Sequence, residues 1–76
     1  MIISEVKLRI IQATKEIQNG TLQNLLYWRN WATNPSRAMN EAEHILCRAL
    51  RNACDRKLAR HHGEYKENED GRMIVV

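Results

Sequence analysis

The chain has 76 residues, and a chain of this length buries only about 60% of the surface that it exposes when unfolded. Its 12 Lys and Arg against 9 Asp and Glu give a net charge of +3, which falls short of a ribosomal or histone-like density but suits an acidic partner. No segment approaches the roughly 20 apolar residues of a membrane span and no charged leader precedes an apolar run, so we expect a cytoplasmic protein that does not enter membranes.

Two short helices joined by a tight turn are expected first. The apolar residues of segment 4–18 recur at spacings of three and four: Val6, Ile10, Ala13 and Ile17. Asn19-Gly20 ends this helix because Gly adopts the left-handed conformation at no steric cost, and Thr21 offers a capping oxygen to a second helix over residues 22–32. The second helix is expected to place Leu22, Leu25, Leu26 and Arg29 on its inner face and Trp31 on the opposite one.

A longer third helix is expected after the Pro35 turn, over residues 37–62, with Gly63 as its stop. Its inner face is predicted to comprise Ala38, Ala42, Ile45, Leu46, Ala49, Leu50 and Ala53. A helix of this extent is about 39 Å long, which is more than the two preceding helices can cover. We therefore expect a homodimer in which a second copy covers the remaining apolar surface.

Segment 64–76 has two interpretations. An Asp70-Gly71 turn signal before a β-branched run predicts a short hairpin, and the alternative is a disordered acidic tail with an apolar end. The expected fold is mainly α: a helical domain over residues 1–63, made of a helical hairpin and a long third helix, followed by a C-terminal tail or β-hairpin over 64–76.

Several side chains that ligate metals lie on the predicted third helix: His44, Cys47, Cys54, His61 and His62. They are spread over several turns and cannot converge on one tetrahedral ion. The two cysteines, about 10 Å apart along the axis, are also too distant for a disulfide, so buried thiols beside the core are the simpler interpretation. No phosphate loop or activated nucleophile occurs, so we expect neither an enzyme, nor a cofactor, nor a small-molecule substrate.

Two groups of side chains are candidates for binding a macromolecule. Tyr27, Trp28 and Trp31 lie off the leucine face of the second helix, so they either anchor a protein interface or lie beneath the third helix. The end of the third helix is basic through Arg48, Arg51, Arg56, Lys57 and Arg60, which form either a solvated face or a surface for phosphate or an acidic protein. Asp55, beside Arg51, is expected at an ordinary solvated position.

Segment 25–32, Leu-Leu-Tyr-Trp-Arg-Asn-Trp-Ala, resembles the opening helix of the phage antiterminator Q family. Segment 40–50, Asn-Glu-Ala-Glu-His-Ile-Leu-Cys-Arg-Ala-Leu, is similar to the acidic and then amphipathic helix of that family. The resemblance covers about residues 22–50; Tyr27-Trp28-Arg29 replaces the usual Trp-Gly step, and the downstream helix-turn-helix of the family is missing. It implies a small phage or prophage regulator that acts in the host cell.

The expected function is non-enzymatic binding of nucleic acid or of a transcription complex, by occupancy of a surface. The alternative is an inhibitor that binds and blocks a host protein complex. Binding that weakens steeply with salt favours the first, because nucleic-acid binding releases counterions. Dependence on Trp28 and Trp31 favours the second.

Overall fold

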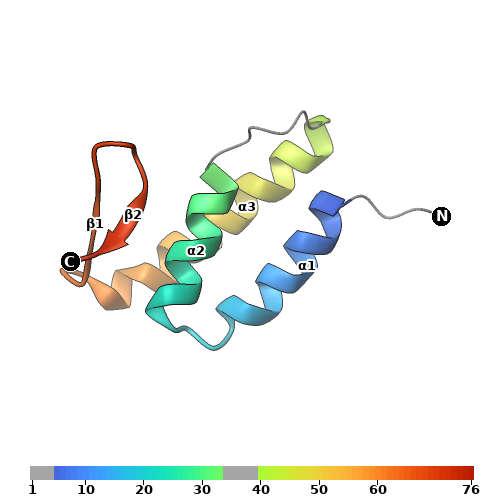
Figure 1. Ribbon diagram of the computed structural model, residues 1–76. Helices are drawn as coiled ribbons and strands as arrows, with labels where there is room; N and C mark the ends of the chain where they lie inside the picture. The colour runs from blue at the N-terminus through green and yellow to red at the C-terminus, as the bar shows by residue number, and fades with distance from the viewer. Residues whose placement is uncertain (1–4, 34–39) are drawn as a thin grey trace.

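The computed structural model describes residues 5–33 and 40–76. The described elements are α1 (Glu5–Ile17), α2 (Leu22–Thr33), α3 (Glu41–Leu58), the short 3₁₀ helix η1 (Ala59–His61), β1 (Tyr65–Glu67) and β2 (Met73–Val75). The chain reverses direction between α1 and α2 and again between α2 and α3, and the hairpin of β1 and β2 lies beyond the end of α3 and beside α2 (Figure 1). The prediction of a mainly α fold with a C-terminal hairpin is confirmed.

Helix α1 follows its predicted apolar stripe. Val6, Ala13 and Ile17 are buried and Ile10 packs against them, while the residues between them face solvent. The helix ends where expected, because Gly20 has a φ of +69° and its N–H donates to the carbonyl of Ile17 at 3.0 Å. This turn brings α2 back along α1.

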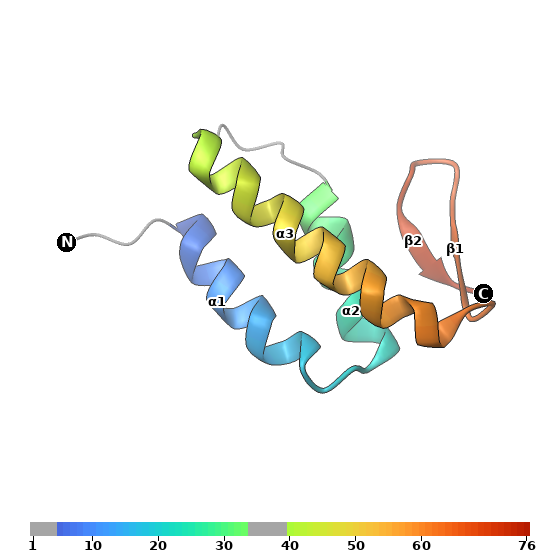
Figure 2. The ribbon, with the colours of Figure 1, turned by 180° about the vertical axis from the view of Figure 1, so that it is seen from behind.

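Helix α2 has a wider buried surface than one apolar stripe. Leu25, Leu26 and Arg29 are buried as predicted, but Trp28 and Ala32 are buried as well. Other elements pack on α2 from several sides, since it contacts α1, α3 and β2 (Figure 2). The prediction that Trp28 lies off the inner face is therefore wrong, because a helix packed on more than one side buries more than its leucine row.

Helix α3 buries a face that only partly coincides with the predicted one. Its buried side chains are Glu43, Cys47, Leu50, Cys54 and Leu58, a stripe with spacings of three and four. Of the residues predicted for the inner face, Leu50 is buried as expected, and Leu46 and Ala53 are half-buried. Ala42, Ile45 and Ala49 are exposed, with Ile45 at 56%. The predicted inner face was misplaced because the two cysteines pack in the core as small apolar residues, on the same stripe as Leu50 and Leu58.

The ends of α3 also differ from the prediction. Asn40 is the N-cap, and its side-chain oxygen accepts a hydrogen bond from the N–H of Glu43 at 2.9 Å. The helix becomes 3₁₀ after Leu58, and Gly63, at a φ of +88°, follows η1. The predicted start at residue 37, including Ala38, and the Pro35 turn lie outside the described residues.

The hairpin is attached to the helices through the side chain of Asn30 and through apolar packing. β1 and β2 are antiparallel, with Tyr65 opposite Val75 and Glu67 opposite Met73. Met73 donates its N–H to Oδ1 of Asn30 at 2.7 Å, and its carbonyl accepts from Nδ2 of the same Asn30 at 2.9 Å. The amide of Asn30 thus bonds both main-chain groups of Met73, as a neighbouring strand would. Tyr65 and Met73 also pack against the core.

Candidate functional site

A row of exposed polar residues follows the outer side of α3. Arg48, Asn52 and Arg56 are exposed and lie at successive spacings of four, which places them on one ridge of the helix with a rise of about 6 Å per step. Arg60, in η1, continues the row. These four residues are called the basic ridge below. It carries three of the five cations that the sequence indicated.

The other two predicted cations lie beside this ridge. Arg51 is exposed on the flank of α3 that carries Asp55, and Lys57 is half-buried on the opposite flank. Within residues 5–33 and 40–76, none of the five cations lies within ion-pair distance of a carboxylate. Their positive charge is therefore not neutralised by the described part of the chain.

The nearest carboxylate in sequence is engaged elsewhere. Asp55 accepts a hydrogen bond from Nε of Arg29 at 2.6 Å, an ion pair that joins α3 to α2. The side chain of Arg29 is 11% exposed and that of Asp55 is 43% exposed. Asp55 is thus accessible, as expected, but its role is structural because it neutralises a guanidinium at the helix interface.

The three aromatic residues of α2 form a series of edge-to-face contacts between surface and core. The ring centroids of Tyr27 and Trp28 are 5.0 Å apart at 90°, and those of Trp28 and Trp31 are 5.6 Å apart at 77°. Trp28 is 1% exposed, Trp31 is half-buried and Tyr27 is 55% exposed. Trp28 therefore cannot anchor a partner without unfolding, and the interface predicted at these residues is reduced to Tyr27 and the accessible part of Trp31.

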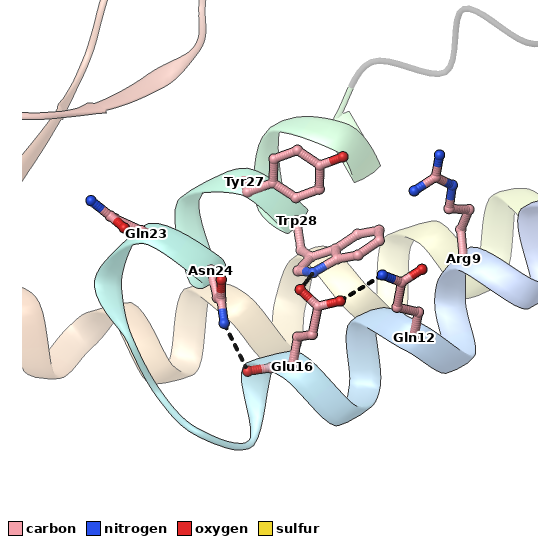
Figure 3. Close-up of a pocket in the computed structure, with 7 residues that line it drawn as sticks. All are labelled: Arg9, Gln12, Glu16, Gln23, Asn24, Tyr27 and Trp28. Atoms are coloured by element: carbon pink, nitrogen blue, oxygen red, sulfur yellow. Dashed lines mark hydrogen bonds between the residues drawn. The ribbon is translucent and has the colours of Figure 1, made fainter.

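A cleft of about 400 Å³ lies between α1 and α2, beside Tyr27 (Figure 3). Its walls are Arg9, Gln12 and Glu16 from α1 and Gln23, Asn24, Tyr27 and Trp28 from α2. Five of these seven side chains are amides or charged groups. The α1 residues of this cleft were not among the predicted site residues. In the sequence, polar positions on the outer side of an amphipathic helix look the same whether they line a cleft or face solvent.

Glu16 organises the floor of this cleft. Its Oε1 accepts a hydrogen bond from Nε1 of Trp28 at 3.3 Å, and its Oε2 accepts one from Nε2 of Gln12 at 2.7 Å. Nδ2 of Asn24 donates to the main-chain carbonyl of Glu16 at 3.5 Å. Figure 3 shows the guanidinium of Arg9 reaching toward the open side of the cleft, on the side to which the Tyr27 hydroxyl points. The cleft is thus held in shape by a polar network.

Cys47 and Cys54 are both buried and neither takes part in a disulfide bond, which agrees with the prediction of thiols beside the core. Burial, reinforced by the charge of Glu43, raises the pKa of Cys47. Burial, reinforced by Asp55, raises the pKa of Cys54 from 9.0 to about 11. Neither thiol is poised for nucleophilic chemistry, because the thiolate is disfavoured at both positions.

No group of three or more His, Cys, Asp or Glu side chains that could hold a metal ion occurs in the part of the chain that the structure describes. His61 has a structural environment instead. Its Nδ1 lies 3.0 Å from Oε2 of Glu64, and its Nε2 lies 3.2 Å from the carbonyl of Gly20. The imidazole therefore links the turn between α1 and α2 to the start of the hairpin.

The pKa of Cys54 gives an expected pH dependence. In the folded chain the thiol titrates near pH 11 and in the unfolded chain near 9.0, so stability is retained below pH 9 and falls between about 9 and 11. The fall is expected to reach at most about 2–3 kcal/mol. Urea unfolding across this range should show a smaller fall for Cys54→Ala than for the unchanged protein. Equal falls would contradict a buried neutral thiol.

No family model, curated protein or solved structure matches the chain. The resemblance of segments 25–32 and 40–50 to the antiterminator Q family therefore stays a hypothesis. None of the described helices is long and apolar enough to cross a membrane.

Proposed function

We propose that the chain is a small regulatory protein without catalytic activity that binds nucleic acid through the basic ridge of α3. The observation that carries this proposal is the row of three arginines, Arg48, Arg56 and Arg60, on one exposed side of α3 and η1. Arginine recognises phosphate through several N–H donors, and these three have no carboxylate partner among the described residues. Counterion release would then supply much of the binding free energy.

The charge distribution of the molecule supports an oriented approach to a polyanion. The outer side of α3 carries the basic ridge, whereas the hairpin and its turn have an excess of carboxylates, with Glu64, Glu67, Glu69 and Asp70 against Lys66 and Arg72. A negatively charged polymer is attracted to the first surface and repelled by the second. The ridge would therefore face the phosphates and the turn of the hairpin would face away from them.

The ridge suits contacts to the phosphate backbone better than readout of bases. Asn52 is the one amide within the row, and arginines about 12 Å apart (Arg48 and Arg56) and about 6 Å apart (Arg56 and Arg60) resemble a series of phosphate contacts more than a recognition surface. We therefore infer binding with weak sequence preference, alone or as part of a transcription complex. The phage context that the family resemblance implies, and the host-cell cytoplasm as location, belong to this proposal.

The expected homodimer also stays a proposal. Ala42, Ile45 and Ala49 lie on the outer side of α3 next to the basic ridge and remain uncovered by the described residues. A second copy packed there would extend the positive surface from one chain to the next. α3 is shorter than expected, so its length supports a dimer less than the exposed side chain of Ile45 does.

Arg56→Gln is expected to lower the salt dependence of DNA binding. Each lost phosphate contact reduces the slope of log K against log salt by about 0.9, so three ridge contacts predict a slope of about −3 and the variant a slope of about −2. Fluorescence anisotropy with a labelled DNA duplex, at salt concentrations from about 50 to about 200 mM, measures both slopes.

Arg72→Gln is the matched control, because it removes the same charge from the hairpin and not from the ridge. Its slope should stay that of the unchanged protein. Equal losses in the two variants would show that net charge, not the ridge, governs binding. If neither DNA nor RNA binds at low salt, the alternative function, an inhibitor that blocks a host protein complex, replaces the proposal.

A further inference from the structure

The cleft between α1 and α2 has a mostly polar lining, which does not suit an apolar ligand. Its one exposed aromatic ring is Tyr27, because the ring of Trp28 is 1% exposed and forms the floor. The other wall residues present amide and charged groups: Arg9, Gln12, Glu16, Gln23 and Asn24. Protein hot spots fill apolar pockets, and this cleft offers no such pocket. A flat, polar ligand with several hydrogen-bonding atoms fits it better.

Tyr27 provides a fixed surface for stacking. Its ring meets Trp28 edge-to-face at 5.0 Å, and Trp28 is itself held by the bond from its Nε1 to Glu16. The Tyr27 ring is thus positioned by a fixed neighbour while the side chain remains 55% exposed. Nucleic-acid bases stack on tyrosine rings of this kind, and stacking tolerates any base because every base has a π-face.

The polar groups around Tyr27 are divided in a way that suits a nucleotide. Arg9, at one end of the cleft, has no ion-pair partner among the described residues and is able to bind a phosphate. Gln23 and Asn24 lie on the α2 wall, and Figure 3 shows the Gln23 amide directed away from Tyr27. Nδ2 of Asn24 donates to the carbonyl of Glu16, so its amide oxygen is the acceptor that can meet the edge of a base. Glu16 is already committed to Gln12 and Trp28, so its carboxylate is held on the floor by two donors.

We propose that this cleft binds one unpaired nucleobase together with its phosphate, with the base stacked on Tyr27 and the phosphate at Arg9. The inference rests on the proposed function, since it adds a site for a single-stranded segment to a protein that holds the phosphate backbone elsewhere. The two sites share no residue: the cleft is made by α1 and α2, and the basic ridge by α3 and η1. Each can therefore be tested without the other.

Adenosine monophosphate is a suitable probe, because it carries one base and one phosphate and is too small to reach both sites. Titration is followed by NMR of the ¹⁵N-labelled protein, in which the two indole N–H groups give separate signals. The Trp28 signal should shift, because this N–H lies in the cleft floor, while the Trp31 signal should stay in place. Adenosine without phosphate should bind about tenfold more weakly, because it forgoes Arg9.

Three variants separate the groups. Tyr27→Ala should weaken binding of the monophosphate about tenfold or more, whereas Tyr27→Phe should change it by less than about twofold because the ring remains. Arg9→Gln should reduce the monophosphate to the affinity of adenosine. Arg72→Gln should leave the titration unchanged, because Arg72 lies outside the cleft and outside the basic ridge.

Several results would overturn the proposal. They are a shift of the Trp31 signal in place of the Trp28 signal, equal binding of adenosine and its monophosphate, and a loss of binding in Tyr27→Phe that equals the loss in Tyr27→Ala. A short polar peptide that displaces the monophosphate at lower concentration would assign the cleft to a protein partner. If the basic ridge does not bind a DNA duplex but the cleft still binds adenosine monophosphate, the proposed function is wrong and the assignment of the cleft remains.

Discussion

Trp28→Ala is expected to remove about 3–5 kcal/mol from the free energy of unfolding, the usual cost of truncating a buried tryptophan. Trp28 is among the largest fully buried side chains of the chain. Its removal deletes the ring contacts with Tyr27 and Trp31 and leaves Glu16 without the indole donor. A small domain has only about 5–15 kcal/mol of stability in total, so this variant should lose a large part of it and unfold at a much lower urea concentration than the unchanged protein.

Tyr27→Ala is the matched control, since it removes the neighbouring aromatic ring from an exposed position. It should cost less than about 1 kcal/mol, because half of the ring already faces solvent. Urea unfolding followed by helical circular dichroism measures both variants. If Tyr27→Ala were as destabilising as Trp28→Ala, the assignment of one ring to the core and the other to the surface would be wrong.

The parts of the fold that sequence alone predicted are those where a local signal and the packing agree. The stripe of Val6, Ala13 and Ile17 defines α1, and Gly20 ends it through its left-handed conformation. The hairpin follows from the Asp-Gly signal, with Gly71 at a φ of +82° and its N–H bonded to the carbonyl of Asn68. In each case the residue type fixes the backbone whatever packs against it.

The parts that sequence missed depend on neighbours. Trp28 is buried because other elements pack on α2 from more than one side. A prediction based on a single apolar stripe of α2 does not include Trp28. On α3, Leu50 was placed correctly, but the small alanines and Ile45 gave a plausible inner face beside it, whereas the buried face combines Leu50 with the cysteines and Leu58. A pattern of residue types does not say which of two adjacent apolar stripes meets a partner within the chain.

The candidate sites show the same division. The basic residues of α3 were visible as a group, since charge is read directly from the sequence, and the structure sorted them into the ridge and its flanks. The cleft was not visible, because it arises from the juxtaposition of two polar helix surfaces. Arg29 was expected on the inner face of α2, yet its partner Asp55 lies 26 positions away on another helix and no local pattern connects them.

The ion pair of Arg29 and Asp55 carries the second large expected effect. Asp55→Ala should lower the free energy of unfolding by about 2–3 kcal/mol. It leaves a guanidinium that is 11% exposed without its carboxylate, and loss of one partner of a buried pair costs about 3–5 kcal/mol. The expected value is lower than that range because Asp55 is 43% exposed, so water screens the pair and can reach the vacated position.

The double variant Arg29→Met with Asp55→Ala distinguishes the cost of an unpaired charge from the value of the pair itself. Methionine fills much of the space of the arginine stem without a charge, so the double variant should be more stable than Asp55→Ala alone. Asp55→Asn, which keeps an acceptor oxygen for Nε of Arg29, should fall between the unchanged protein and Asp55→Ala. Urea unfolding of the unchanged protein, the single variants Arg29→Met and Asp55→Ala, and the double variant yields the coupling free energy through a double-mutant cycle. Additive effects of the two single changes would mean that the contact between α2 and α3 does not depend on this pair, and that Asp55 is the solvated residue that its sequence position suggested.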